Sequence, residues 1–90
     1  MKSPRGAVLN VVAHHTGRPV STIHPWQELE RDLEMTPLEL VLVALEVEDI
    51  EAVELDVSTL DRARTVGELV TFFTREVARA RLALADRDVA

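Results

Sequence analysis

The chain contains no cysteine, three glycines and three aromatic residues. Without cysteine, neither a disulfide framework nor a thiolate metal site can form. Three glycines leave little material for a backbone loop that cradles phosphate, and the sequence contains no P-loop and no G-x-S-x-G motif. The longest apolar run, Leu40 to Leu45, is far too short to cross a bilayer. We therefore expect neither an enzyme nor a membrane-bound protein.

Histidine and carboxylate patterns typical of metal sites are also missing. The adjacent His14 and His15 would point about 100° apart on a helix, so they are poorly placed to share an ion. The sequence has no H-x-x-x-H spacing and no D-x-[DN]-x-[DN]-G calcium loop. We expect no metal site.

The length of 90 residues predicts one small domain that spans residues 1–90. Trp26, Phe72 and Phe73 are the three aromatic residues, so the core must be mainly aliphatic. Met1 to Gly6 leads into no long apolar stretch of the kind found in a signal peptide. We expect a cytoplasmic protein.

The acidic residues are concentrated in the middle of the chain. Residues 28–61 contain twelve Asp or Glu and one Arg, whereas residues 1–27 and 62–90 carry net charges of +3 and +2. The phosphates of a nucleic acid would be repelled by such a segment, and a basic protein surface would be attracted to it. The alternative is an ordinary solvated face, which is what most charge runs are.

Three helices are predicted from apolar spacing. The first covers about residues 4–16, with Ser3 as N-cap, Pro4 as first helical residue and Gly17 as its stop. A long connection, residues 18–35, follows; Pro19 and Pro25 interrupt any helix through it. Its expected anchors on the helices are Ile23, Trp26, Leu29 and Leu33.

The second helix is predicted from Pro37 to about Asp49. Thr36 and Glu39 form a T-x-x-E capping box, and Pro37 occupies the first helical position, where its missing N–H costs nothing. Two apolar rows follow helical spacing: Leu38, Val41, Leu42 and Leu45 on one side, and Leu40, Val43, Val47 and Ile50 on the other. Periodicity alone leaves open which row belongs to the core.

A short helical turn is expected within residues 58–63, and a second capping box, Thr65 with Glu68, opens the last helix. Its core face comprises Val66, Leu69, Val70, Phe73 and Val77. Residues 75–85 are rich in Ala, Leu and Arg, so this helix can extend past a core of about residues 5–77 into a tail, residues 78–90.

The stretch from Asp32 to Leu38 reads D-L-E-M-T-P-L and resembles the D-L-G-x-D-S-L motif of acyl carrier proteins. The resemblance covers roughly residues 5–77. It implies an all-α, four-helix bundle with a long first loop and a short third helix. It also implies that the row with Leu40, Val43 and Val47 points inward, and that the row with Leu38, Val41 and Leu45 faces partner enzymes.

In that family, the motif serine carries a 4'-phosphopantetheine arm, and Pro37 occupies the matching position here. Proline has no hydroxyl, so we expect no prosthetic group. Thr36 is the nearest hydroxyl and is better explained as an N-cap. Two alternatives remain open: attachment of the arm at an atypical residue such as Thr36, and an unrelated helical module in which Pro37 is merely a favourable first residue.

The expected role is protein–protein interaction, as a monomer, with enzymes of fatty-acid or polyketide type. The second helix would dock on a basic, partly apolar patch. Leu38, Val41, Leu42 and Leu45 would supply the apolar contacts, flanked by Glu39, Glu46, Glu48 and Asp49. The alternative role is a working carrier of acyl or aminoacyl groups with an atypical 4'-phosphopantetheine attachment.

Overall fold

A computed structural model describes residues 4–89, with side chains described to residue 85. Within these residues the chain forms three α-helices, α1 (Arg5–Thr16), α2 (Pro37–Glu51) and α3 (Val66–Val89), and two 3₁₀ turns, η1 (Val20–Thr22) and η2 (Leu60–Arg62). The all-α prediction is confirmed. The structure does not confirm the predicted count of four helices, because η2, a turn of three residues, lies where the short third helix was expected.

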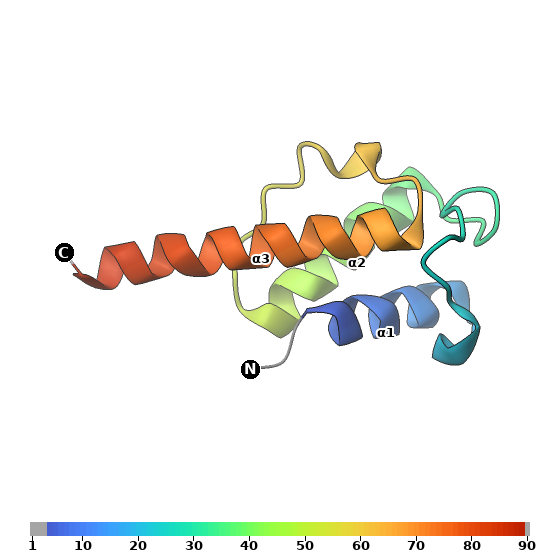
Figure 1. The fold of residues 1–90 in the computed structure, drawn as a ribbon, viewed down its shortest axis with the longest axis horizontal. Helices are drawn as coiled ribbons and strands as arrows, with labels where there is room; N and C mark the ends of the chain where they lie inside the picture. The colour runs from blue at the N-terminus through green and yellow to red at the C-terminus, as the bar shows by residue number, and fades with distance from the viewer. Residues whose placement is uncertain (1–3, 90) are drawn as a thin grey trace.

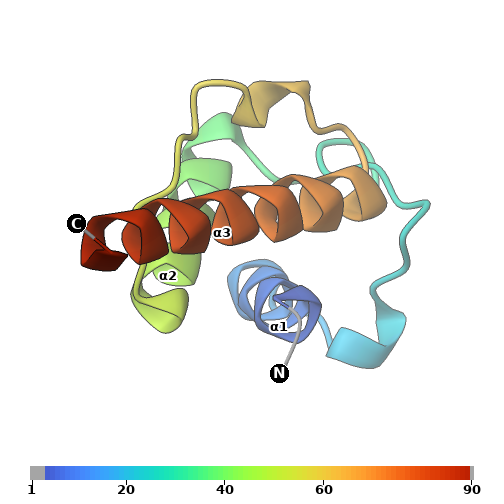
Figure 2. The same cartoon turned by 60° about the vertical axis from the view of Figure 1, so that its left-hand side comes forward.

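The long helix α3 lies across α1 and α2, and its C-terminal half projects beyond both of them (Figures 1 and 2). One apolar core fills the space between the three helices. Phe73 and Leu69 of α3 are its largest fully buried side chains, and α1 contributes Val8, Val11 and Val12. The predicted core face of the last helix is therefore confirmed, with Val70 partly buried at the edge.

Helix α1 begins one residue later than predicted. Pro4 precedes it in a helical conformation, and its carbonyl accepts a hydrogen bond from the Val8 N–H at 2.9 Å. The predicted cap, Ser3, lies outside the described residues. Gly17 ends the helix as predicted: its φ is 67°, a left-handed conformation that glycine adopts at little cost.

Three of the four predicted anchors of the long first connection are buried, namely Ile23, Leu29 and Leu33. The prediction for Trp26 was wrong, since its side chain is 72% exposed and stacks on His24 with ring centroids 4.5 Å apart. The backbone on both sides of Trp26 is fixed to the start of α3: the Gly67 N–H donates to Pro25 O, and the Val66 N–H donates to Gln27 O. These bonds hold the main chain against the helix while the ring of Trp26 stays in solvent.

The last helix starts with the predicted capping box. The Thr65 N–H donates to the Glu68 carboxylate at 3.1 Å, and the Glu68 N–H donates to the Thr65 hydroxyl at 3.2 Å. Helix α3 then continues to Val89, which confirms the extension predicted from its Ala, Leu and Arg content. Its final turns reach past the C-terminal end of α2 (Figure 1).

Candidate functional site

The N-terminus of α2 is built by the capping box predicted from the sequence. The Glu39 N–H donates to the Thr36 hydroxyl at 3.2 Å, and the Thr36 N–H donates to the Glu39 carboxylate at 3.1 Å. Pro37 follows as the first helical residue and is exposed. The structure thus places Pro37 on the surface, at the first turn of α2.

The two apolar rows of α2 have different environments. Val43 and Val47 are fully buried, with Leu40 packed against the core, whereas Ile50 is exposed near the end of the helix. The other row is exposed and comprises Leu38, Val41, Leu42 and Leu45. The resemblance implied this for Leu38, Val41 and Leu45. Leu38 is the most exposed of these, at 68%. A row of four exposed large aliphatic side chains on one helix is a candidate contact surface for another protein.

Two of the predicted flanking carboxylates also hold the fold together. Glu46 accepts a hydrogen bond from His15 Nε2 at 2.8 Å, which joins α2 to α1. Glu48 accepts from the Leu55 N–H at 2.8 Å, which joins α2 to the following loop. Asp49 is exposed. Of these three, Asp49 has the side chain most accessible to a partner.

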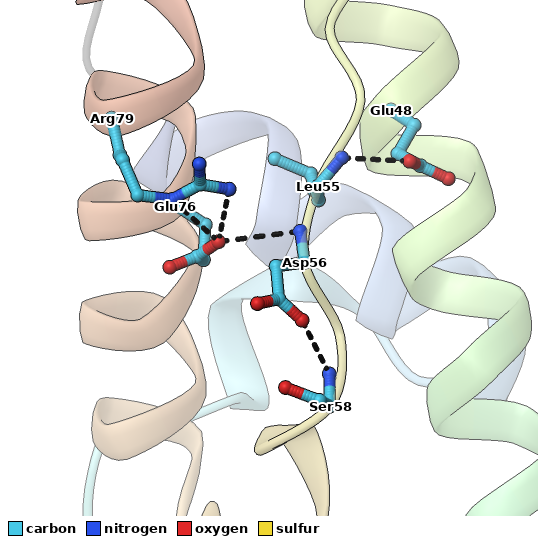
Figure 3. Close-up of polar contacts among 6 residues, drawn as sticks. All are labelled: Glu48, Leu55, Asp56, Ser58, Glu76 and Arg79. Carbon is cyan, nitrogen blue, oxygen red and sulfur yellow. Dashed lines mark hydrogen bonds and ion pairs between the residues drawn. The ribbon is translucent and has the colours of Figure 1, made fainter. Parts of the chain in front are cut away.

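The loop between α2 and η2 is held between α2 and α3 by carboxylates (Figure 3). The Asp56 N–H donates to Glu76 at 3.3 Å, and Arg79 donates two hydrogen bonds to the same carboxylate oxygen. The Ser58 N–H donates to the Asp56 carboxylate at 3.0 Å, and this bond, together with the nearby Arg79, lowers the pKa of Asp56. The pKa of Arg79 is raised by its hydrogen bond to Glu76.

A groove of about 820 Å³ runs beside the N-terminal half of α2. Pro37 and Val41 line one side, and the segment around η2 lines the other. Its apolar lining comprises Leu29, Met35, Leu40, Val57, Leu60 and Ala63. Its lining also includes Glu28, Glu30, Arg31, Asp61 and Arg64, so Pro37 lies beside a groove with both apolar and charged walls.

In the described part of the chain, no three His, Asp or Glu side chains lie together as a metal site would require. Among residues 4–89, no helix combines the length and apolar character needed to cross a membrane. The rings of His14 and His15 pack edge to face, with centroids 5.8 Å apart, and the His15 ring is hydrogen-bonded to Glu46.

Residues 6–73 match the family model described as phosphopantetheine attachment site. The chain is also 34% identical over 71 residues to acyl carrier protein 3 of Ralstonia nicotianae, an alignment that covers 79% of this chain and 82% of that protein. The chain belongs to the acyl carrier protein family. The resemblance stated from the sequence is confirmed, and members of this family are carriers and not enzymes.

The family implies a 4'-phosphopantetheine group attached through a side-chain hydroxyl. Pro37 offers no hydroxyl for that bond. The hydroxyl of the adjacent Thr36 accepts from the Glu39 N–H and lies 3.2 Å from the Glu39 carboxylate. Of the two residues that begin α2, Thr36 therefore has the hydroxyl, and that hydroxyl caps the helix.

Sequence reasoning missed the contacts that join segments far apart in the chain. His15 and Glu46 are 31 residues apart, and Asp56 and Glu76 are 20 apart. No local spacing signals such pairs, because they depend on how the helices are placed in space. Covariation between positions 15 and 46 among homologues is a signal that could have found the first pair. The second pair uses the backbone N–H of Asp56, so the side chain at position 56 gives no such signal.

Proposed function

We propose that this chain is a carrier-like domain without a prosthetic arm, which acts by binding enzymes of fatty-acid or polyketide type. The observation that carries the proposal is Pro37: it occupies the first position of α2, is exposed, and lacks the hydroxyl that attachment needs. Proline preserves the start of the helix while removing the nucleophile. In this proposal, α2 is retained as the helix that faces partner enzymes, whereas the hydroxyl that would attach the prosthetic group is absent.

The partner surface in this proposal is the exposed face of α2. Leu38, Val41, Leu42 and Leu45 supply apolar area, and Glu39, Glu46, Glu48 and Asp49 supply negative charge around it. Apolar side chains surrounded by charge suit a partner patch that is partly apolar and rimmed by Lys or Arg. Attraction between such charges speeds encounter and weakens as salt is added.

Intact-mass measurement after co-expression with a broad-specificity phosphopantetheinyl transferase tests the absence of the arm. We expect the mass of the unmodified chain. The addition of one phosphopantetheine that disappears in Thr36→Val would overturn this proposal and establish the second candidate, a carrier with atypical attachment. Thr36→Ser, which keeps a hydroxyl, is the matched control for the variant.

Pro37→Ser is the variant expected to be modified in the same experiment. It restores a hydroxyl at the first turn of α2, and the capping box of Thr36 and Glu39 is retained. We expect this variant to gain one phosphopantetheine, whereas Pro37→Ala stays unmodified. If neither the natural chain nor Pro37→Ser is modified, features besides the missing hydroxyl also exclude the transferase.

Binding to purified condensing enzymes of the two pathway types tests the partner surface. We expect Leu42→Glu with Leu45→Glu to reduce binding at least about tenfold, because charge replaces apolar contact area. Leu82→Glu is the control, since Leu82 is also an exposed leucine but lies on the tail of α3. If the double variant bound as tightly as the natural chain, α2 would not be part of the interface.

A further inference from the structure

A second groove, of about 1070 Å³, lies at the opposite end of α2 from Pro37. It is bounded by the C-terminal turns of α2, the loop that follows and the projecting part of α3. Its apolar lining comprises Leu45, Ala52, Val53, Leu55, Ala80, Ala83 and Leu84. Leu45 and Leu84 are 55% and 44% exposed, so large apolar side chains on two helices remain accessible there.

One wall of this groove is made by residues outside the family match. The match ends at residue 73, whereas Ala80, Ala83 and Leu84 come from the extension of α3. This extension is tied to the bundle, because Arg81 pairs with Glu51 at the end of α2. The extension therefore presents a surface that lies beyond the matched residues and is joined to α2 by an ion pair.

The charges around the groove are strongly unbalanced. Its lining includes four carboxylates, on Glu48, Asp49, Glu54 and Asp56, and one guanidinium, on Arg79. Arg79 already pairs with Glu76, at 2.8 Å. Asp49 and Glu54 are exposed, and neither makes a hydrogen bond or ion pair with another described residue. The rim thus presents uncompensated negative charge next to apolar area.

We propose that this groove binds a basic segment of a partner protein, with apolar side chains seated against Leu45 and Leu84 and with Lys or Arg side chains placed over Asp49 and Glu54. Charge complementarity selects this occupant, because an acidic or neutral segment would leave those carboxylates unpaired. The inference builds on the proposed function, since it takes binding to other proteins as the role of the domain. It adds a contact region on α3 that shares Leu45 with the α2 surface.

The groove is tested with a short amphipathic peptide of leucine and lysine as probe, added to the full ¹⁵N-labelled chain. We expect amide shift changes centred on the residues around Leu45, Glu54 and Leu84. Affinity should fall as salt is raised. A peptide of the same pattern with glutamate in place of lysine should not bind.

Matched variants separate specific docking from attraction to an acidic protein. Leu84→Glu should weaken binding of the lysine peptide about tenfold, whereas Leu82→Glu should leave it unchanged, because Leu82 lies two residues away and does not line the groove. Glu54→Lys should likewise weaken binding, whereas Glu30→Lys, which alters an exposed carboxylate in the other groove, should not. Circular dichroism of each variant verifies that the helices are retained.

Three results would overturn the inference. The first is equal affinity for Leu84→Glu and Leu82→Glu. The second is a set of shift changes confined to Leu38, Val41 and Leu42, which would leave α2 as the docking surface without the α3 extension. The third is self-association of the free chain that Leu84→Glu abolishes, which would make a second copy the occupant. The mass measurement on Pro37 is independent of all three.

Discussion

Thr36 and Glu39 satisfy each other's backbone N–H groups across the first turn of α2, at 3.1 and 3.2 Å. Pro37, between them, has no N–H to satisfy. The N–H groups of Thr36 and Glu39 are therefore satisfied without any ligand at this end of the helix.

Removing the cap should destabilise the fold measurably. We expect Thr36→Ala to lower the free energy of unfolding by about 1 kcal/mol, because the Glu39 N–H loses its acceptor. Thr36→Ser should recover most of the loss. Thr71→Ala, at an exposed position within α3, serves as control and should have little effect in urea denaturation. Equal stabilities of Thr36→Ala and the natural chain would show that the cap contributes nothing.

Phe73 should be the most costly single truncation in the core. It is fully buried among the helices, and replacing a buried phenylalanine by alanine costs about 3–5 kcal/mol. Since small domains are stable by only roughly 5–15 kcal/mol, Phe73→Ala should be largely or partly unfolded at 37 °C. Phe72→Ala is the matched control, because the neighbouring ring is only partly buried. Thermal melts in which Phe72→Ala lost as much stability would contradict this assignment of the core.

Gly67 should resist substitution, unlike Gly6. A Cβ on Gly67 would lie 3.2 Å from Pro25 O, the atom that accepts its N–H, so the loop cannot withdraw without weakening that bond. A Cβ on Gly6 meets nothing within 4 Å. We expect Gly6→Ala to raise stability by about 0.5 kcal/mol and Gly67→Ala to lower it. If both substitutions raised the stability, the loop at Pro25 would be able to shift and relieve the close contact with the new Cβ.

Acid should weaken the start of α3. The backbone N–H groups of Arg64 and Thr65 donate to Glu68 and lower its pKa from the ordinary value of 4.5. Because the pKa is lower in the folded than in the unfolded chain, the charged carboxylate stabilises the fold above pH 4.5, and this contribution is lost as the pH falls through the folded value.

The pH dependence can be measured with Glu68→Gln. Melting temperatures between pH 6 and pH 3 should fall less steeply for this variant than for the natural chain. Glu30→Gln, at an exposed position in the first loop, should follow the natural curve. Parallel curves for Glu68→Gln and the natural chain would rule out the linkage.

The sequence predicted those features that depend on neighbouring residues. Both capping boxes, the Gly17 stop and the extension of α3 follow from residue types three or four positions apart, or from the sum of local propensities. The family motif likewise lies in one short stretch, so Pro37 could be recognised before any coordinates. Trp26 was wrongly predicted to be buried, because the burial of a loop residue depends on how the loop is attached to the helices. Here backbone hydrogen bonds hold the loop, and the Trp26 side chain stays exposed.

The sequence by itself determined the helices, their caps and the absence of a hydroxyl at residue 37. Periodicity left open which row of α2 is core; the family resemblance implied the answer, and the tertiary structure shows it. Only the tertiary structure decided which carboxylates are engaged by His15 or by loop N–H groups, and that Leu45 and Leu84 share a groove. The physical reason is the distance along the chain over which each interaction acts. Caps and helix propensity act within one turn, whereas burial and ion pairing depend on which surfaces the packing of three helices brings together.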